Sequence, residues 1–232
     1  MRLRILPVLS LAVALLLAGG ALTGCGGAPA NGVATKPAPE VVAAAKAAAD
    51  GASSVHISGS LASNGSPITV NLDLVAGKGG RGQVSEDGLS LELIHLGGTV
   101  YIKGSPAFYR RVGGATAAQL LQGRWLKAPA TVGSFASLAS LSDLRRLVDM
   151  ALAINGTPTL AGTTTVGGQK AVGVTDAAKT GTLYVATTGT PYPIAVAEGG
   201  ASSGKIMFDR WNEPVPLAAP ANALDITKLQ SG

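Results

Sequence analysis

Three signatures of catalysis or phosphate binding overlap in the segment Gly199–Lys205, which reads Gly-Gly-Ala-Ser-Ser-Gly-Lys. Its spacing matches a phosphate-binding loop, a nucleophile elbow around Ser202, and a Ser-x-x-Lys pair. A phosphate-binding loop needs Ser or Thr after the lysine and must lead into a helix, but Ile206 follows here, and the next residues alternate like a strand. An elbow serine also needs a later histidine, and both histidines precede Ser202. We therefore predict a plain Gly/Ser turn between two strands.

The other side chains of catalytic type are isolated from one another. His56 and His95 have neither the His-x-x-x-His nor the Cys-x-x-Cys spacing of a zinc site. Glu86 and Asp87 share a turn, where solvated carboxylates are expected, whereas a catalytic pair would need burial. These observations predict a protein that is not an enzyme and that uses no metal or other cofactor.

The single cysteine stands at the end of a hydrophobic leader. Arg2 and Arg4 precede an apolar run over Ile5–Leu17, which small residues follow, as in a secretory signal. The run is short for a membrane span, which needs about 20 apolar residues. The segment Leu22–Cys25, Leu-Thr-Gly-Cys, resembles the bacterial lipobox, in which the cysteine thiol receives a diacylglycerol. We predict lipidation of Cys25 and a location on the extracytoplasmic face of the cell membrane. An ordinary secretory signal beside a chance cysteine is the alternative.

The charge pattern argues against a nucleic-acid partner. The formal net charge is +5, but the basic residues cluster only in the pairs Arg110-Arg111 and Arg145-Arg146. A nucleic-acid groove shows a basic stripe with stacking aromatic side chains, and aromatic residues are only 4% of this chain. We therefore expect no nucleic-acid binding.

The composition divides the chain into three parts. Residues 1–24 form the predicted signal peptide, and residues 25–38 are small, Pro/Gly-rich and without periodicity, which predicts a flexible tether. Residues 39–232 form one domain. It opens with a helix over 39–50, because Pro and Glu suit a first turn, the alanines that follow favour a helix, and Gly51 ends it.

From Ser54 onward the hydrophobic pattern has a period of two. Short alternating segments joined by Gly-rich turns predict an antiparallel meander up to Lys103. One face of these strands is apolar. Its side chains are Val55, Ile57, Ile68, Val70, Leu72, Leu74, Leu89, Leu91, Leu93, Val100 and Ile102.

Helices and a second meander follow. We expect a short helix over 116–122 and a longer one over 134–153, which Ser142 restarts as an N-cap. The longer helix places Leu144, Leu147 and Val148 on its apolar stripe. Alternation then resumes between Thr159 and Trp211. The order of elements predicts an α+β fold with helices packed on one face of an antiparallel sheet.

With this layout, the sequence resembles the actinobacterial lipoprotein family that includes LppX, LprA, LprF and LprG, and more distantly the LolA/LolB half-barrels. The residues that carry the resemblance are the lipobox, Val55–Gly59 after the first helix, Leu160–Val172, Tyr192–Val196 and Lys205–Val215. The resemblance covers about Val41 to Ala219. It implies a U-shaped antiparallel half-barrel with helices over its concave face and a hydrophobic cavity for the acyl chains of lipids or glycolipids.

Two hypotheses of function follow. In the first, the apolar strand face together with Leu144, Leu147 and Val148 lines a cavity for acyl chains. The protein, anchored through Cys25, would carry lipid across the envelope, with an envelope transporter or another lipoprotein as partner. The head group would lie near Lys103, Arg110 or Arg111. In the second, the helix over 134–153 packs flush on the sheet, and the protein is an envelope interaction or sensing lipoprotein with a closed core and no lipid ligand.

Overall fold

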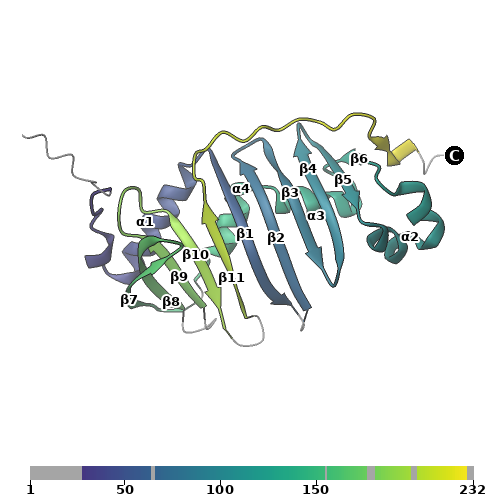
Figure 1. Ribbon diagram of the computed structural model, residues 1–232. Helices are drawn as coiled ribbons and strands as arrows, with labels where there is room; N and C mark the ends of the chain where they lie inside the picture. Colours follow the sequence, from purple (N-terminus) through teal and green to yellow (C-terminus); the bar gives the residue numbers. More distant parts are fainter. Residues whose placement is uncertain (1–27, 64–65, 155, 177–180, 200–202, 229–232) are drawn as a thin grey trace, which may run out of the picture.

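The computed structural model describes residues 28–63, 66–154, 156–176, 181–199 and 203–228 (Figure 1). The leader, the lipobox with Cys25, and Ser202 lie outside the described residues. The turn predicted at Gly199–Lys205 is therefore described only at its ends, where Gly204 begins a strand rather than a helix.

Within the described residues, twelve strands form one sheet in the order β12-β6-β5-β4-β3-β2-β1-β11-β10-β9-β8-β7. Every pairing is antiparallel except that of β12 with β6. This curved, open sheet with helices on its concave face confirms the predicted α+β half-barrel. The strands are β1 (Ser54–Ser63), β2 (Ser66–Val75), β3 (Gly79–Glu86), β4 (Leu89–Leu96), β5 (Thr99–Gly104), β6 (Leu126–Pro129), β7 (Pro158–Val166), β8 (Gln169–Asp176), β9 (Gly181–Ala186), β10 (Pro193–Glu198), β11 (Gly204–Asp209) and β12 (Leu224–Asp225).

The two meanders are joined through the first and eleventh strands. β1 pairs with β2 on one side and with β11 on the other, and Ile57 stands opposite both Leu72 and Phe208. His56 Nδ1 lies 2.6 Å from Asp209 Oδ1 across this seam. Residues about 150 positions apart thus become neighbours, and the apolar faces of both meanders form one continuous surface.

In Figure 1, the helices over 133–141 and 144–151 lie behind the sheet, and the helix over 106–121 lies at its end, beside β5 and β6. The predicted first helix is α1 (Ala38–Asp50), and it buries one stripe made of Val41, Ala45 and Ala49. Their spacing of four residues repeats along one helix face, so α1 packs closely on α4 and on the strands beneath it. The other helical elements are η1 (Val33–Thr35), α2 (Pro106–Leu121), α3 (Gly133–Leu141), α4 (Leu144–Ala151) and η3 (Ile226–Lys228).

The single helix predicted over 134–153 is two helices. The break falls at Ser142, but the N-cap of α4 is Asp143, whose Oδ1 accepts the Arg146 N–H at 3.1 Å. The prediction of Ser142 as the cap was therefore wrong by one residue, and Ser142 is fully buried instead. The short helix predicted over 116–122 is the second part of α2, which is kinked at Gly114 (φ 77°, ψ −174°). The prediction missed the first part, which Ser105 caps.

Much of the predicted flexible tether is docked on the domain. The side-chain amide of Asn31 donates to the Ala186 carbonyl at 2.9 Å, and the backbone N–H of Gly189 donates to the Pro29 carbonyl at 3.0 Å. Val33 is buried in the core beside α1. The prediction of a flexible tether over 25–38 is therefore wrong from Pro29 onward, because Val33 gains burial that holds the segment on the sheet.

Candidate functional site

A cavity of about 560 Å³ lies between the concave face of the sheet and the α3–α4 helices. Its wall is almost entirely aliphatic, and its polar side chains are Glu86, Thr182 and Glu198. The lining residues are Ile57, Leu61, Ile68, Val70, Leu72, Val84, Glu86, Leu141, Leu147, Met150, Ala151, Leu152, Ala153, Ile154, Val174, Gly181, Thr182, Leu183, Val196, Glu198, Ile206 and Phe208.

Glycines on the concave face help to explain why space remains. Strand alternation puts Gly59, Gly82 and Gly204 on the same face as their lining neighbours, where each contributes no side chain. Gly59 has φ 144°, and a Cβ there would overlap the carbonyl oxygen of Lys205. Backbone packing therefore requires glycine at this position, and the sheet is bare directly beneath the helices.

The strand register places the mouth of the cavity. Glu86 pairs with Ile68, Ile68 with Leu61, Leu61 with Gly204, and Gly204 with Glu198. These five residues form one row across β3, β2, β1, β11 and β10, at the ends of the strands. Four inter-strand steps separate the two glutamates, or roughly 19 Å along the sheet. The mouth thus has two apolar side chains in its middle and a carboxylate on each flank.

The residues predicted for the cavity are divided between the cavity and two cores, except for one residue that lies in none of the three. Five of them line the cavity: Ile57, Ile68, Val70, Leu72 and Leu147. Four are buried in the adjoining core between the sheet and the helices α1 and α4: Val55, Leu74, Leu144 and Val148. Four belong to a separate core under α2 and α3, namely Leu91, Leu93, Val100 and Ile102, while Leu89 is half-buried and belongs to neither core.

The second meander supplies lining residues that sequence reasoning missed. Val174, Leu183, Val196, Ile206 and Phe208 face the cavity from β8 to β11. Alternation is present in each of these strands and could have identified them. The sequence does not reveal that β1 pairs with β11. This pairing places the apolar face of β8–β11 next to the apolar face of β1 and β2.

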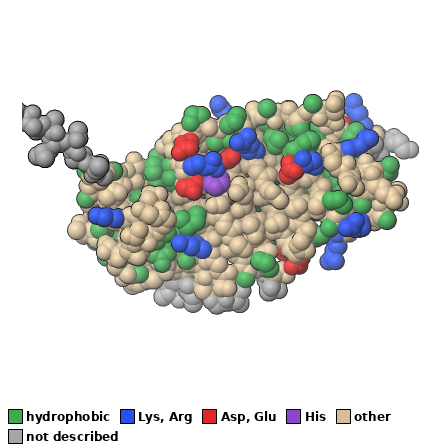
Figure 2. Space-filling model, in the orientation of Figure 1, with side chains coloured by type: hydrophobic (Ala, Val, Ile, Leu, Met, Phe, Trp, Pro, Cys, Tyr) green, Lys and Arg blue, Asp and Glu red, His purple; other side chains and the backbone are tan. Residues whose placement is uncertain are grey.

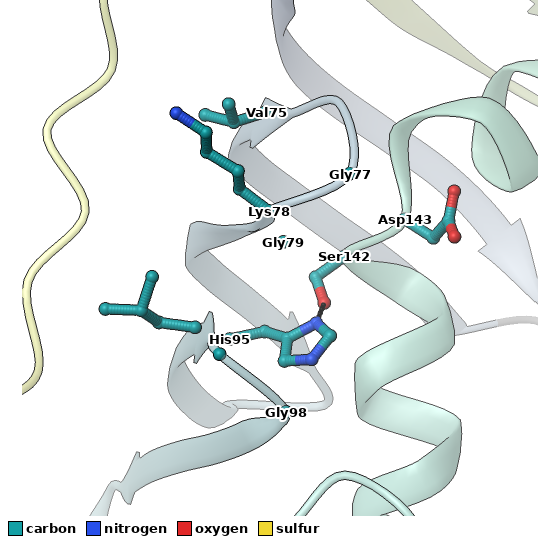
Figure 3. Close-up of a pocket in the computed structure, with 10 residues that line it drawn as sticks. Val75, Gly77, Lys78, Gly79, His95, Gly98, Ser142 and Asp143 are labelled. Carbon is teal, nitrogen blue, oxygen red and sulfur yellow. Dashed lines mark hydrogen bonds between the residues drawn. The ribbon is translucent and has the colours of Figure 1, made fainter.

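A second hollow, of about 390 Å³, lies where the β2–β3 and β4–β5 turns meet the α3–α4 junction (Figure 3). Ser142 Oγ lies 2.8 Å from His95 Nδ1 and 2.8 Å from the Ala139 carbonyl. The carbonyl can only accept, so the hydroxyl donates to it and accepts the Nδ1–H. Ser142 has no exposed surface, and burial lowers the pKa of His95. The pair holds the helix junction on the sheet, and its hydroxyl is out of reach of a substrate.

Acidic, basic and histidine side chains gather on the sheet face turned away from the helices (Figure 2). Asp73 accepts from Arg210 Nη2 at 2.8 Å and from Arg81 Nε at 3.3 Å, and His56 bonds to Asp209 beside them. These groups neutralise one another across β1, β2, β3 and β11. Among the described residues, no group of three or more His, Cys, Asp and Glu side chains could hold a metal ion.

The basic residues expected near a head group lie elsewhere. Lys103 pairs with Glu92 at 2.7 Å and sits 5.1 Å from the centre of the Trp125 ring. Arg110 and Arg111 are exposed on α2. None of the three lines the cavity. The charge at its mouth is therefore the opposite of the one that the sequence led us to expect.

In the described part of the chain, no helix has the length and apolarity to cross a membrane. No protein-family model matches the sequence, and no curated protein matches it.

Among solved structures, the chain is similar to LprF from Mycobacterium bovis, with a TM-score of 0.57 and 15% identity over 84% of this chain and 100% of that one. It is also similar to the lipoprotein LppX from Mycobacterium tuberculosis, with a TM-score of 0.51 and 16% identity over 78% and 99% of the two chains. At these identities the likeness concerns the fold. The resemblance found in the sequence is thus confirmed at that level: this chain has the LprF/LppX fold.

Proposed function

We propose that this protein is a lipid-anchored protein of the extracytoplasmic membrane face that binds acyl chains in the cavity beneath α4. The observation that carries the proposal is the aliphatic wall of that cavity, formed by both meanders. The fold supports the proposal, because LppX, which has the same fold, is a lipoprotein.

The physical chemistry of the cavity favours an acyl chain over water. A buried water needs two to four polar partners, and the aliphatic wall offers very few. Each methylene group moved from water into such a site contributes about 0.8 kcal/mol. The volume of about 560 Å³ is that of a small-molecule binding site. The closed-core alternative predicts no such space, so the cavity counts against it.

The anchor would hold the domain against the bilayer. We propose residues 1–24 as signal peptide, Cys25 as the lipidated residue and 39–232 as the lipid-binding domain. Three residues separate Cys25 from Pro29, which is already hydrogen-bonded to Gly189. Four residue steps span at most about 14 Å. Lipid would thus pass between this membrane and the cavity, and an envelope transporter or another lipoprotein would receive it.

Native mass spectrometry of the purified full-length protein, before and after denaturation, tests the proposal. Lipid held in the cavity leaves on denaturation, whereas lipid attached to Cys25 remains. Val70→Trp places a large side chain in the cavity and is expected to abolish the non-covalent lipid. Val112→Trp, the same substitution at an exposed position of α2, is the matched control and should retain it. Protein that carries no releasable lipid after exposure to envelope lipids would contradict the proposal.

A further inference from the structure

The mouth of the cavity is acidic. Glu86 and Glu198 are the charged side chains that line it, and no described Lys or Arg joins them. Glu86 follows Val84 by two positions, and Glu198 follows Val196 by two, so strand alternation points both carboxylates to the concave side. The acyl chains of a lipid would enter between them, over Leu61 and Ile68.

Neither carboxylate has a cationic partner among the described residues. The acids in the ion pairs of this part of the chain are Glu40, Glu92, Asp73, Asp149 and Asp209. Glu92 makes the contrast clear, because it lies on the opposite face of the sheet and pairs with Lys103. Within the part of the chain that the structure describes, the two charges at the mouth are therefore uncompensated and act on whatever stands there.

Building on the proposed function, we infer that the mouth selects lipids by head-group charge, accepting uncharged, hydroxyl-bearing head groups and rejecting anionic ones. A hydroxyl can donate a charge-assisted hydrogen bond to Glu86 or Glu198. An anionic head group is repelled by both carboxylates, and the apolar wall beside them weakens the screening by water. Two like charges at the mouth are expected to lower the affinity for an anionic lipid by about three- to tenfold.

A pair of ligands with the same acyl chain separates head-group charge from chain burial. Monoolein is uncharged and carries hydroxyl groups, whereas oleate at pH 8 is an anion. Binding of each to the full-length protein is measured by native mass spectrometry at moderate ionic strength, since salt screens the effect. The test variant is Glu86→Gln/Glu198→Gln, which keeps the shape of both side chains. Glu92→Gln, which removes the same charge from the other face, is the matched control.

The wild-type protein and Glu92→Gln should bind monoolein about three- to tenfold more tightly than oleate. In the double variant, oleate binding should rise until the preference is largely lost, with monoolein affinity within about twofold of wild type. Equal binding of both ligands by the wild type would overturn the charge selection and leave acyl binding standing. The same preference in the double variant would also overturn it. Binding of neither ligand would overturn the proposed function itself.

Discussion

The two halves of this sheet present the same kind of apolar face and cover it differently. Under α2 and α3, the strands β4, β5 and β6 are packed against Tyr109, Phe135 and their neighbours in a filled core. Under α4, the strands β1, β2, β3 and β8–β11 leave about 560 Å³ open. One sheet thus combines a region that stabilises the fold with a region that is available to a ligand.

The difference lies in what the helices bring. Tyr109 is almost completely buried, its hydroxyl oxygen accepts the Gly104 N–H at 3.0 Å, and its ring meets Phe108 edge-on at 5.6 Å. Toward the cavity, α4 offers Leu147, Met150 and Ala151, with no aromatic ring. A sheet face patterned for burial is therefore filled or left open according to the bulk of the opposing helix.

The largest expected effect is in the filled half. Tyr109→Ala should lower the free energy of unfolding by about 3–5 kcal/mol, because it leaves a cavity in a packed core. Urea denaturation measures the change. Tyr109→Phe is the control, and it should cost less, about 1–3 kcal/mol, since it removes only the hydroxyl that accepts the Gly104 N–H and donates to the Arg124 carbonyl. A cost below about 1 kcal/mol for Tyr109→Ala would mean that this half is not packed as described.

Truncating one leucine in each half should affect the stability of the protein to different degrees. Leu93→Ala in the filled core should cost about 2–5 kcal/mol, because Leu93 is 1% exposed. Leu61→Ala at the cavity mouth should cost less than about 1 kcal/mol, because its side chain is only half-buried and borders open space. Both are measured by urea denaturation in the absence of lipid. Equal losses from the two substitutions would remove the distinction between the halves.

A smaller, pH-dependent effect is expected where the helices meet. Burial lowers the pKa of His95 below its ordinary value of 6.5, so the unfolded chain binds more protons near that pH. The contribution of neutral His95 to the free energy of unfolding is present above about pH 6.5. It is lost as the pH falls toward the pKa of His95 in the folded protein. Thermal melts from pH 8 to 5 should show this loss in the wild type and a shallower one in His95→Asn. Parallel profiles would exclude His95 as the cause.

The smallest effect is expected on the sheet face turned away from the helices. Asp73→Asn should cost at most about 1 kcal/mol, because the side chains of its partners Arg81 and Arg210 are 43% and 48% exposed, so water screens both ion pairs. The loss should shrink further at 1 M salt, and urea denaturation at two salt concentrations measures it. A larger, salt-independent cost would show that this charge cluster holds β1 and β11 together.

The sequence predicted the elements better than the site. Alternation identified the strands from Val55 to Ile102 and their apolar face, and the Pro/Glu start, the alanine run and Gly51 identified α1. Val70 lines the cavity and Val100 is in the filled core. Alternation cannot distinguish them, because both stand at apolar positions of the same alternating pattern. That distinction depends on the pairing of β1 with β11 and on which helix lies above, and these are contacts between distant residues. The charge of the mouth was missed for the same reason, since only the register brings Glu86 and Glu198 into one row.

In the proposed function, acyl chains occupy the space between α4 and the strands beneath it. A crystal structure of the protein bound to a monoacylglycerol brominated along its chain tests this most directly, since anomalous scattering locates the bromine. We predict a peak between Val70 and Leu147, with α4 in place above it. Bromine elsewhere on the protein, or α4 lying flush on the sheet with no space beneath it, would show that this space does not bind acyl chains.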